Sequence, residues 1–386
     1  MVALPTAAAA ATPFPLGVYV GNANGNDTAA MERFKDGFRA HMTVLGSRPK
    51  FFNAFTDFRR DPSQWASSAS WGAWSSKRSG ADYLGSQTGI IPVVGIPLAA
   101  PKQRFRTVDD FYRDTVAGRY DAAWTGIVDA WAGNGYKTID FRIAYEMNGN
   151  FMPWAPGNSS APDARRNFVL AFQHVADILH ARARAKGVTA MVHWNPVAIN
   201  HTSFDVTQLY PGDAYVDVIA IDQYSPMHPL DLTDWSTGGK VKLTDRQAWA
   251  AIPANRRHHW RYPNATFSQP VPGPRAWGWS MPQLIALAKL HGKPIGVDET
   301  GVGAGTGGGI GPADDPEFPR YLAGILAEAR AQGVAIRNVM IWDAKLGDGH
   351  WDFRGGSKPL TAAAWRRYFG DPAGVDGDGP GRPRDR

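Results

Sequence analysis

The stretch TIDFRIAYEMNGN, residues 138–150, decides the fold class of this chain. It begins as an apolar run typical of a buried strand and reaches Glu146, after which the residues Met-Asn-Gly-Asn stop the strand. KPIGVDETG, residues 293–301, repeats the pattern and carries Glu299 near its end. Strands with near-continuous apolar character are typical of a parallel sheet that is covered on both faces.

Six further apolar runs of this kind occur, so the sequence predicts eight strands. Their ranges are 16–23, 51–58, 89–97, 138–146, 190–196, 216–224, 293–301 and 338–345. Amphipathic segments with helical periodicity separate them, at 28–44, 105–133, 163–186, 280–292 and 316–333. Eight strand–helix units predict an α/β fold, a single-domain (β/α)8 TIM barrel over residues 16–370.

A doubly wound open sheet is the alternative architecture. It is disfavoured because the turn after the first strand, GNANGN at 21–26, lacks the G-x-G-x-x-G spacing of a dinucleotide-binding sheet. The segment 225–279, rich in Pro, Trp, Arg and His, predicts a long insertion after the sixth strand. We expect a flexible lead at 1–15 and a disordered tail at 371–386, where Gly, Pro and charged residues dominate.

The composition limits the chemistry. The 386 residues include no Cys, which excludes disulfides, thiolate nucleophiles and Cys-ligated metals. The formal net charge is +6, but the basic residues are scattered and form no nucleic-acid recognition motif. No run of 18 apolar residues predicts a membrane span. We expect a monomer without cofactor, metal, membrane or nucleic-acid partner. We also expect it to be secreted or periplasmic, with a signal peptide that has been removed or that this sequence does not include.

Glutamate is scarce, since only five of the 35 acidic residues are Glu. Glu32, Glu317 and Glu328 lie in predicted helices among polar neighbours, as solvated residues do. Glu146 and Glu299 end strands instead, and the carboxyl ends of barrel strands form the active face. Two carboxyl groups at one mouth, one protonated and one ionised, are what glycosidic cleavage requires. The alternative is that each Glu caps a helix or pairs with an Arg.

The chain resembles glycoside hydrolase family 26, a family of retaining (β/α)8 glycosidases, over about residues 16–369. The resemblance is strongest in RIAYEMNG, residues 142–149, and its following aromatic residues. It implies that Glu146 is the general acid/base and that Glu299, in DETG, is the nucleophile. It also implies that Tyr224, in VDVIAIDQY, hydrogen-bonds the nucleophile.

One residue departs from the family pattern. Tyr145 stands where the family usually has His immediately before the acid/base. The change leaves the carboxylate in place but alters its neighbour. β-Mannan is therefore the first expectation for the substrate, and β-glucan, β-xylan and a bacterial exopolysaccharide remain open.

Aromatic and polar residues near strand ends are the candidates for sugar contacts, because sugar C–H faces stack on aromatic rings. Arg142 is expected on the same strand face as Glu146, where it could stabilise a carboxylate or pair with a strand Asp. By the same alternation, Asp298 is expected to face away from Glu299. The predicted substrate-binding residues are Tyr224, Trp154, Trp342, Trp194, Asn148, Arg142, Tyr145, Phe151, Asp222 and Trp351.

The sequence therefore predicts a retaining endo-β-glycosidase with a polysaccharide or oligosaccharide substrate. The retaining mechanism requires carboxyl groups about 5–5.5 Å apart. A barrel that binds polysaccharide without cleaving it is the alternative, and the presence of both strand-end Glu residues disfavours it. A metal-dependent barrel hydrolase would carry His-x-His in the first strand, where GVYVGNAN contains no His.

Overall fold

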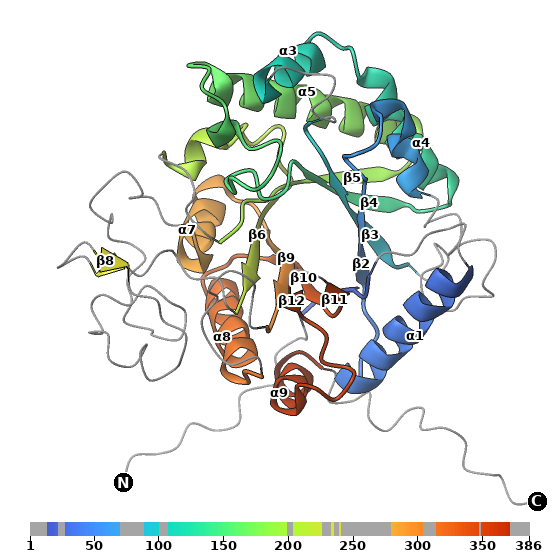
Figure 1. The fold of residues 1–386 in the computed structure, drawn as a ribbon, viewed down its shortest axis with the longest axis vertical. Coiled ribbons are helices and arrows are strands. Elements are labelled where there is room, and N and C mark those ends of the chain that lie inside the picture. Colours follow the sequence, from blue (N-terminus) through green and yellow to red (C-terminus); the bar gives the residue numbers. More distant parts are fainter. Residues whose placement is uncertain are drawn as a thin grey trace, which may run out of the picture.

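Eight parallel strands close into a barrel in the computed structural model, and helices surround them (Figure 1). The structure describes residues 14–21, 28–69, 89–99, 107–198, 204–225, 233–234, 239–240, 279–303, 314–346 and 349–370. The barrel strands are β1 (Leu16–Tyr19), β2 (Phe51–Phe55), β3 (Ile91–Ile96), β4 (Thr138–Ile143), β5 (Thr189–Trp194), β6 (Val218–Tyr224), β9 (Ile295–Gly301) and β10 (Ile336–Trp342). The predicted TIM barrel is confirmed, and each predicted strand range contains or overlaps one of these strands.

Seven α-helices lie on the outside of the barrel within the described ranges. They are α1 (Thr28–Leu45), α3 (Val108–Val116), α4 (Asp121–Gly133), α5 (Ala164–Ala185), α7 (Met281–His291), α8 (Glu317–Ala331) and α9 (Pro359–Phe369). The predicted segment 105–133 contains two helices because the chain turns at Gly118, whose φ of 79° favours glycine. Helix α9 was not predicted.

Strand β4 shows why the barrel interior is polar. Asp140 and Arg142 alternate with Ile139, Phe141 and Ile143, and all five are fully buried. The apolar residues join the large hydrophobic cluster that includes the helices, whereas the charged residues contact polar groups of other strands. The barrel axis therefore holds charge, and the site at its mouth rests on that charge.

Strand β9 contains a bulge that orients the seventh strand end. Val297 aligns with Ile221 of β6, but the next β6 residue, Asp222, aligns with Glu299, so Asp298 is an extra residue. A bulge breaks the strict alternation of faces. Asp298 consequently contacts Arg142, as Glu299 does, and the prediction that the two acidic residues face opposite sides is wrong.

The bulge also depends on a glycine. A Cβ at Gly296 would lie 2.8 Å from the side-chain oxygens of both Asn338 and Asp298. The carboxylate of Asp298 therefore occupies the space that a side chain at position 296 would need.

Both chain ends and the predicted insertion are only partly described. Phe14 of the predicted lead packs on Phe369 of α9 with ring centroids 5.3 Å apart, so this part of the lead is structured. Residues 1–13 and the tail 371–386 lie outside the described residues. Of the segment 225–279, the structure describes its first residue, its last residue and the pair β7 (Thr233–Asp234) and β8 (Gly239–Lys240). None of the described helices is long and apolar enough to cross a membrane.

Candidate active site

A tight turn, rather than the strand itself, presents Glu146. Strand β4 ends at Ile143, and Ala144 and Glu146 have φ values of 49° and 54°, which non-glycine residues seldom adopt. The backbone N–H of Glu146 donates to the carbonyl of Asn195 at 2.7 Å, and its carbonyl accepts from Gly149 at 2.8 Å. The expectation that Arg142 and Glu146 share a strand face is therefore wrong, because the strand ends before Glu146.

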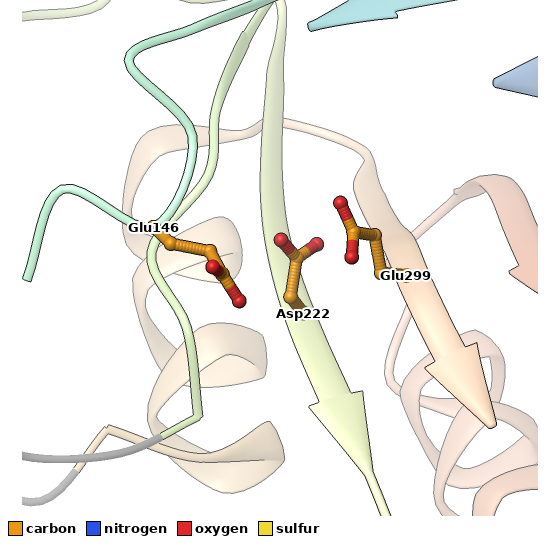
Figure 2. A group of neighbouring side chains, drawn as sticks. All are labelled: Glu146, Asp222 and Glu299. Carbon is orange, nitrogen blue, oxygen red and sulfur yellow. The ribbon is translucent and has the colours of Figure 1, made fainter. Parts of the chain in front are cut away.

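Three carboxylates converge at the barrel mouth. Glu146 extends from the turn after β4, Asp222 from β6 and Glu299 from β9, and their side chains point toward one another (Figure 2). One oxygen from each carboxylate lies within 4.8 Å of the other two, and all three residues are buried. The three groups come from segments that lie far apart in the sequence, and the closed barrel brings them together.

Arg142 supplies the positive charge at the centre of this cluster. Its Nη1 lies 2.8 Å from Oε1 of Glu299, and its Nη2 donates to Oδ2 of Asp222 at 2.6 Å. The sequence left open whether Arg142 stabilises a carboxylate or pairs with a strand Asp, and it does both. Arg142 and Asp222 are fully buried, so the prediction that they bind substrate directly is wrong. Instead, Arg142 pairs with Glu299, and Asp222 pairs with Arg142.

Asn195, directly after β5, was not among the site residues predicted from the sequence. Its Oδ1 accepts from Nε of Arg142 at 2.7 Å, and its Nδ2 donates to Oδ1 of Asp222 at 3.0 Å. Its backbone carbonyl holds Glu146. One amide residue thus links three of the charged residues, and its position at a strand end was the signal that could have revealed it.

Glu299 has two donors on its carboxylate. Besides Arg142, the hydroxyl of Tyr224 donates to Oε2 at 2.8 Å, so the strand-end tyrosine bonds this carboxylate as predicted. Burial raises the pKa of Glu299 above the usual range, while Arg142 and Tyr224 oppose that shift. Burial, and then the Glu299 and Glu146 carboxylates, raise the pKa of Asp222 well above its usual value, against the opposing effect of Arg142.

A continuous aromatic wall borders the carboxylates. Trp342 lies 4.0 Å from Tyr19 and 6.2 Å from Tyr224 between ring centroids, and Trp351 lies 4.5 Å from Tyr224. Phe55 continues the wall, 5.7 Å from Trp342. Trp342 and Trp351, both predicted to bind substrate, thus contact the tyrosine that donates to Glu299, and the structure adds Tyr19 and Phe55 to the wall.

Tyr145 extends the wall on the side of the acid/base candidate. Its ring lies 5.4 Å from Phe55, and the guanidinium carbon of Arg142 lies 5.1 Å from its centroid. A Cβ at Gly95 would lie within 3.0 Å of the rings of Phe55 and Tyr145, so glycine is needed for this packing. Tyr145 contacts Arg142 and reaches solvent only slightly, with 8% of its surface exposed.

Two tryptophans predicted as sugar platforms belong to the core. Trp154 and Trp194 are fully buried, and their indole N–H groups donate to the carbonyls of Tyr145 and Leu209. Both substrate-binding predictions are wrong, because neither ring reaches the surface. A tryptophan near a strand end does not reveal from its sequence position which way its ring turns.

Two residues predicted to contact sugar follow β4, and one of them is buried whereas the other is exposed. The side chain of Asn148 donates to the carbonyl of Val197 at 2.9 Å and accepts from its N–H at 2.8 Å, joining two loops. This backbone role replaces the predicted sugar contact, because Asn148 is buried. Phe151 is 53% exposed and remains a candidate for a sugar contact.

The three carboxylates also form a group that could hold a metal ion. Hard cations such as Ca²⁺ and Mg²⁺ prefer such oxygen ligands. In this cluster, however, the Arg142 guanidinium already pairs with Asp222 and Glu299. The positive charge that these carboxylates require comes from the chain itself.

Comparison with known proteins agrees with the sequence motif. Residues 135–257 match the model of glycosyl hydrolase family 26, and this segment includes the turn that carries Glu146. The predicted resemblance to family 26 is confirmed. Within the chain, 114 residues are 34% identical to Endoglucanase H of Acetivibrio thermocellus. That match covers 29% of this chain and 12% of the Endoglucanase H sequence.

Solved structures support the fold beyond the family 26 segment. An endo-β-1,4-mannanase double mutant from Cellulomonas fimi aligns with a TM-score of 0.50 at 17% identity, over 93% of this chain and 69% of that chain. An engineered protein aligns with a TM-score of 0.51, also at 17% identity, over 93% of this chain and 68% of that chain. At these identities the likeness concerns the barrel fold alone.

Proposed function

We propose that the chain is a retaining glycoside hydrolase that cleaves a β-linked polysaccharide, with Glu146 as acid/base and Glu299 as nucleophile. The observation that carries the proposal is the approach of the two carboxylates, whose nearest oxygens lie within 4.8 Å. Retaining enzymes hold these groups about 5–5.5 Å apart, whereas inverting enzymes need about 6.5–9.5 Å to admit a water. The cluster supports direct attack by Glu299.

In the first step, an oxygen of Glu299 attacks the anomeric carbon while Glu146 donates its proton to the departing glycosidic oxygen. The C–O bond to the leaving sugar breaks, and a covalent glycosyl ester of Glu299 forms. Attack requires the ionised carboxylate, which the Arg142 ion pair and the Tyr224 hydrogen bond favour.

In the second step, Glu146, now ionised, takes a proton from a water molecule that attacks the same carbon. The ester bond breaks, and Glu299 leaves as a carboxylate. Two inversions give net retention of the anomeric configuration. Asp222 and Asn195 hold Arg142 in place through both steps.

β-Mannan is the first substrate to test. The similar solved structure from Cellulomonas fimi is titled an endo-β-1,4-mannanase, and the matched curated protein is named an endoglucanase. The aromatic wall of Tyr19, Trp342, Tyr224 and Trp351 suits sugar rings of either polymer, because stacking on C–H faces does not distinguish one hydroxyl. The choice between β-mannan and β-glucan therefore needs a measurement.

The test is a panel of β-mannan, β-glucan, β-xylan and bacterial exopolysaccharides, with product sizing and ¹H NMR of the first product. We expect internal cleavage and a β-anomer that appears before mutarotation. Glu299→Gln is the matched control and should be inactive with polymer binding retained. Binding by the unaltered protein without any cleavage would contradict the proposal and favour a polysaccharide-binding barrel, and an initial α-anomer would overturn retention.

A further inference from the structure

Below the carboxylates, a buried series of alternating charges runs through the barrel interior. Arg337 pairs with Asp140 at 2.8 Å, Asp140 contacts Nε2 of His193 at 3.1 Å, and Nδ1 of His193 contacts Asp298 at 2.8 Å. Asp298 lies 3.5 Å from Nε of Arg142. The four inner side chains are fully buried, and Arg337 is 23% exposed at the other end of the series.

The geometry favours a His193 that carries two ring protons. A neutral imidazole has one N–H and one lone pair, and here the lone pair would face a carboxylate oxygen. Arg337 donates to both oxygens of Asp140, and Asn338 donates to Asp298. Burial raises the pKa of Asp298, but His193, Arg142 and Asn338 outweigh it and hold that pKa below its usual value. Burial lowers the pKa of His193, but the carboxylates of Asp298 and Asp140 outweigh it and raise the pKa to about 9.

We propose that His193 is a positioning residue for Glu299. As a buried imidazolium it holds Asp298, and thereby keeps the Arg142 guanidinium aligned with the carboxylate of Glu299. The kinetic consequence rests on the proposed glycosidase function, whereas the effect on the Glu299 carboxyl does not.

The charge balance around His193 shows why the imidazolium matters. The titratable and charged groups on the strands packed around it are Asp140 and Arg142 of β4, Asp222 of β6, Asp298 and Glu299 of β9, and Arg337 of β10. Four of these are carboxylates and two are cations, so the imidazolium supplies the third positive charge. Without it, Asp298 lacks its imidazolium partner and competes with Glu299 for Arg142, so the pKa of Glu299 rises.

The chain offers a direct measurement, because it contains only five glutamates. With ¹³C label at the Glu side-chain carboxyls, Glu299 is assigned by the signal lost in Glu299→Gln and titrated in the full chain. In His193→Gln we expect its midpoint to move to higher pH by about one pH unit. His174→Asn removes a histidine that pairs with Asp121 outside the barrel, and should leave the midpoint unchanged.

A second substitution separates charge from contact. In His193→Asn, the amide nitrogen can take the place of the histidine Nδ1 as a donor to Asp298. In His193→Gln, the amide nitrogen can take the place of the histidine Nε2 as a donor to Asp140. We expect His193→Asn to shift the Glu299 midpoint less than His193→Gln does. Equal stability losses with an unmoved midpoint in both variants would overturn the proposal and leave His193 a structural residue.

Kinetics give the complementary readout. On a polysaccharide that the unaltered protein cleaves, His193→Gln should lower kcat about tenfold and leave KM within twofold. The acid limb of the pH profile of kcat/KM should move to higher pH. A change in KM alone would contradict the positioning role. An unaltered protein that cleaves no glycan overturns the proposed function, while the Glu299 titration still decides the role of His193.

One measurement avoids variants that fail to fold. In the unaltered full chain with ¹⁵N-labelled histidine, one side chain should keep both ring protons at pH 8. This is expected because the carboxylate partners of His193 raise its pKa to about 9. A spectrum in which no histidine remains doubly protonated at pH 8 would overturn the proposal.

Discussion

At the scale of single residues, the two glutamates differ in what holds them. The Glu299 carboxylate accepts a hydrogen bond from Tyr224 and pairs with Arg142, which together favour its charged form despite burial. Glu146 sits on a turn whose left-handed backbone is held by Asn195. The nucleophile assignment therefore rests on side-chain partners, and the acid/base assignment on the turn that aims Glu146.

Removing the Tyr224 hydroxyl tests its hydrogen bond to Glu299. A hydrogen bond to a charged group is worth about 1.5–3 kcal/mol, which corresponds to about a tenfold to hundredfold change in rate. We expect Tyr224→Phe to lower kcat by that factor. The acid limb of the pH–rate profile should move to higher pH, because the Glu299 carboxylate loses a donor and its pKa rises. Near-native kcat and an unmoved acid limb would mean that the bond has no role in attack.

Glu146 is tested by varying the leaving group. Glu146→Ala should lower the rate on polymer far more than on activated aryl glycosides, whose aglycones depart without protonation. Added azide should restore turnover on the aryl substrate, since it attacks the glycosyl ester without a general base. Equal losses on both substrate classes would argue against an acid role for Glu146.

At the scale of elements, strand ends and turns decide whether an aromatic residue packs in the large core or beside the carboxylates. Trp194 ends β5 and packs at 5.4 Å against both Tyr210 and Trp279 on the outside of the barrel. Trp342 ends β10 and faces the aromatic wall beside the carboxylates. Two tryptophans at equivalent strand positions thus serve the core and the mouth respectively.

The same substitution at both positions separates these roles. Trp194→Phe removes volume from the core and the hydrogen bond to Leu209, so we expect the free energy of unfolding to fall by about 1–3 kcal/mol with kcat/KM unchanged. Trp342→Phe should raise KM several-fold with a smaller stability loss, because its Nε1 has no acceptor among the described residues. Urea titration and polymer kinetics on both variants measure this, and a reversed pattern would contradict the assignment.

At the scale of the whole molecule, a charged barrel interior makes stability depend on pH. His193 is fully buried between Asp140 and Asp298, and its pKa of about 9 exceeds the value of about 6.5 expected in the unfolded chain. Since the folded state binds this proton more tightly, the contribution to stability is complete below about pH 6.5 and is lost as pH rises through about 9.

This linkage gives a prediction for unfolding. Between pH 6.5 and pH 9 we expect the free energy of unfolding to lose about 3 kcal/mol from this group. His193→Gln should be less stable at neutral pH and should show a flatter decline over the same range. Urea titrations at half-unit pH steps measure both curves, and parallel curves would show that His193 does not titrate with folding.

The sequence alone was sufficient for the barrel and for the two glutamates. Apolar runs of strand length and helical periodicity are local patterns, and a parallel barrel brings the ends of its strands to one mouth. Glu146 and Glu299 could therefore be placed together before any coordinates. In both cases an apolar run followed directly by a Glu was enough to predict that position, and this pattern spans only a few neighbouring residues.

Only the tertiary structure decided what surrounds the two glutamates. The left-handed turn at Glu146 and the extra residue in β9 break the simple alternation of strand faces. The burial of Trp154 and Trp194 was likewise not evident from their positions in the sequence. Each depends on contacts between strands far apart in the chain, such as the hydrogen bond from Glu146 to Asn195. Which direction a side chain takes at a strand end is set by packing against distant elements, and local sequence does not contain those neighbours.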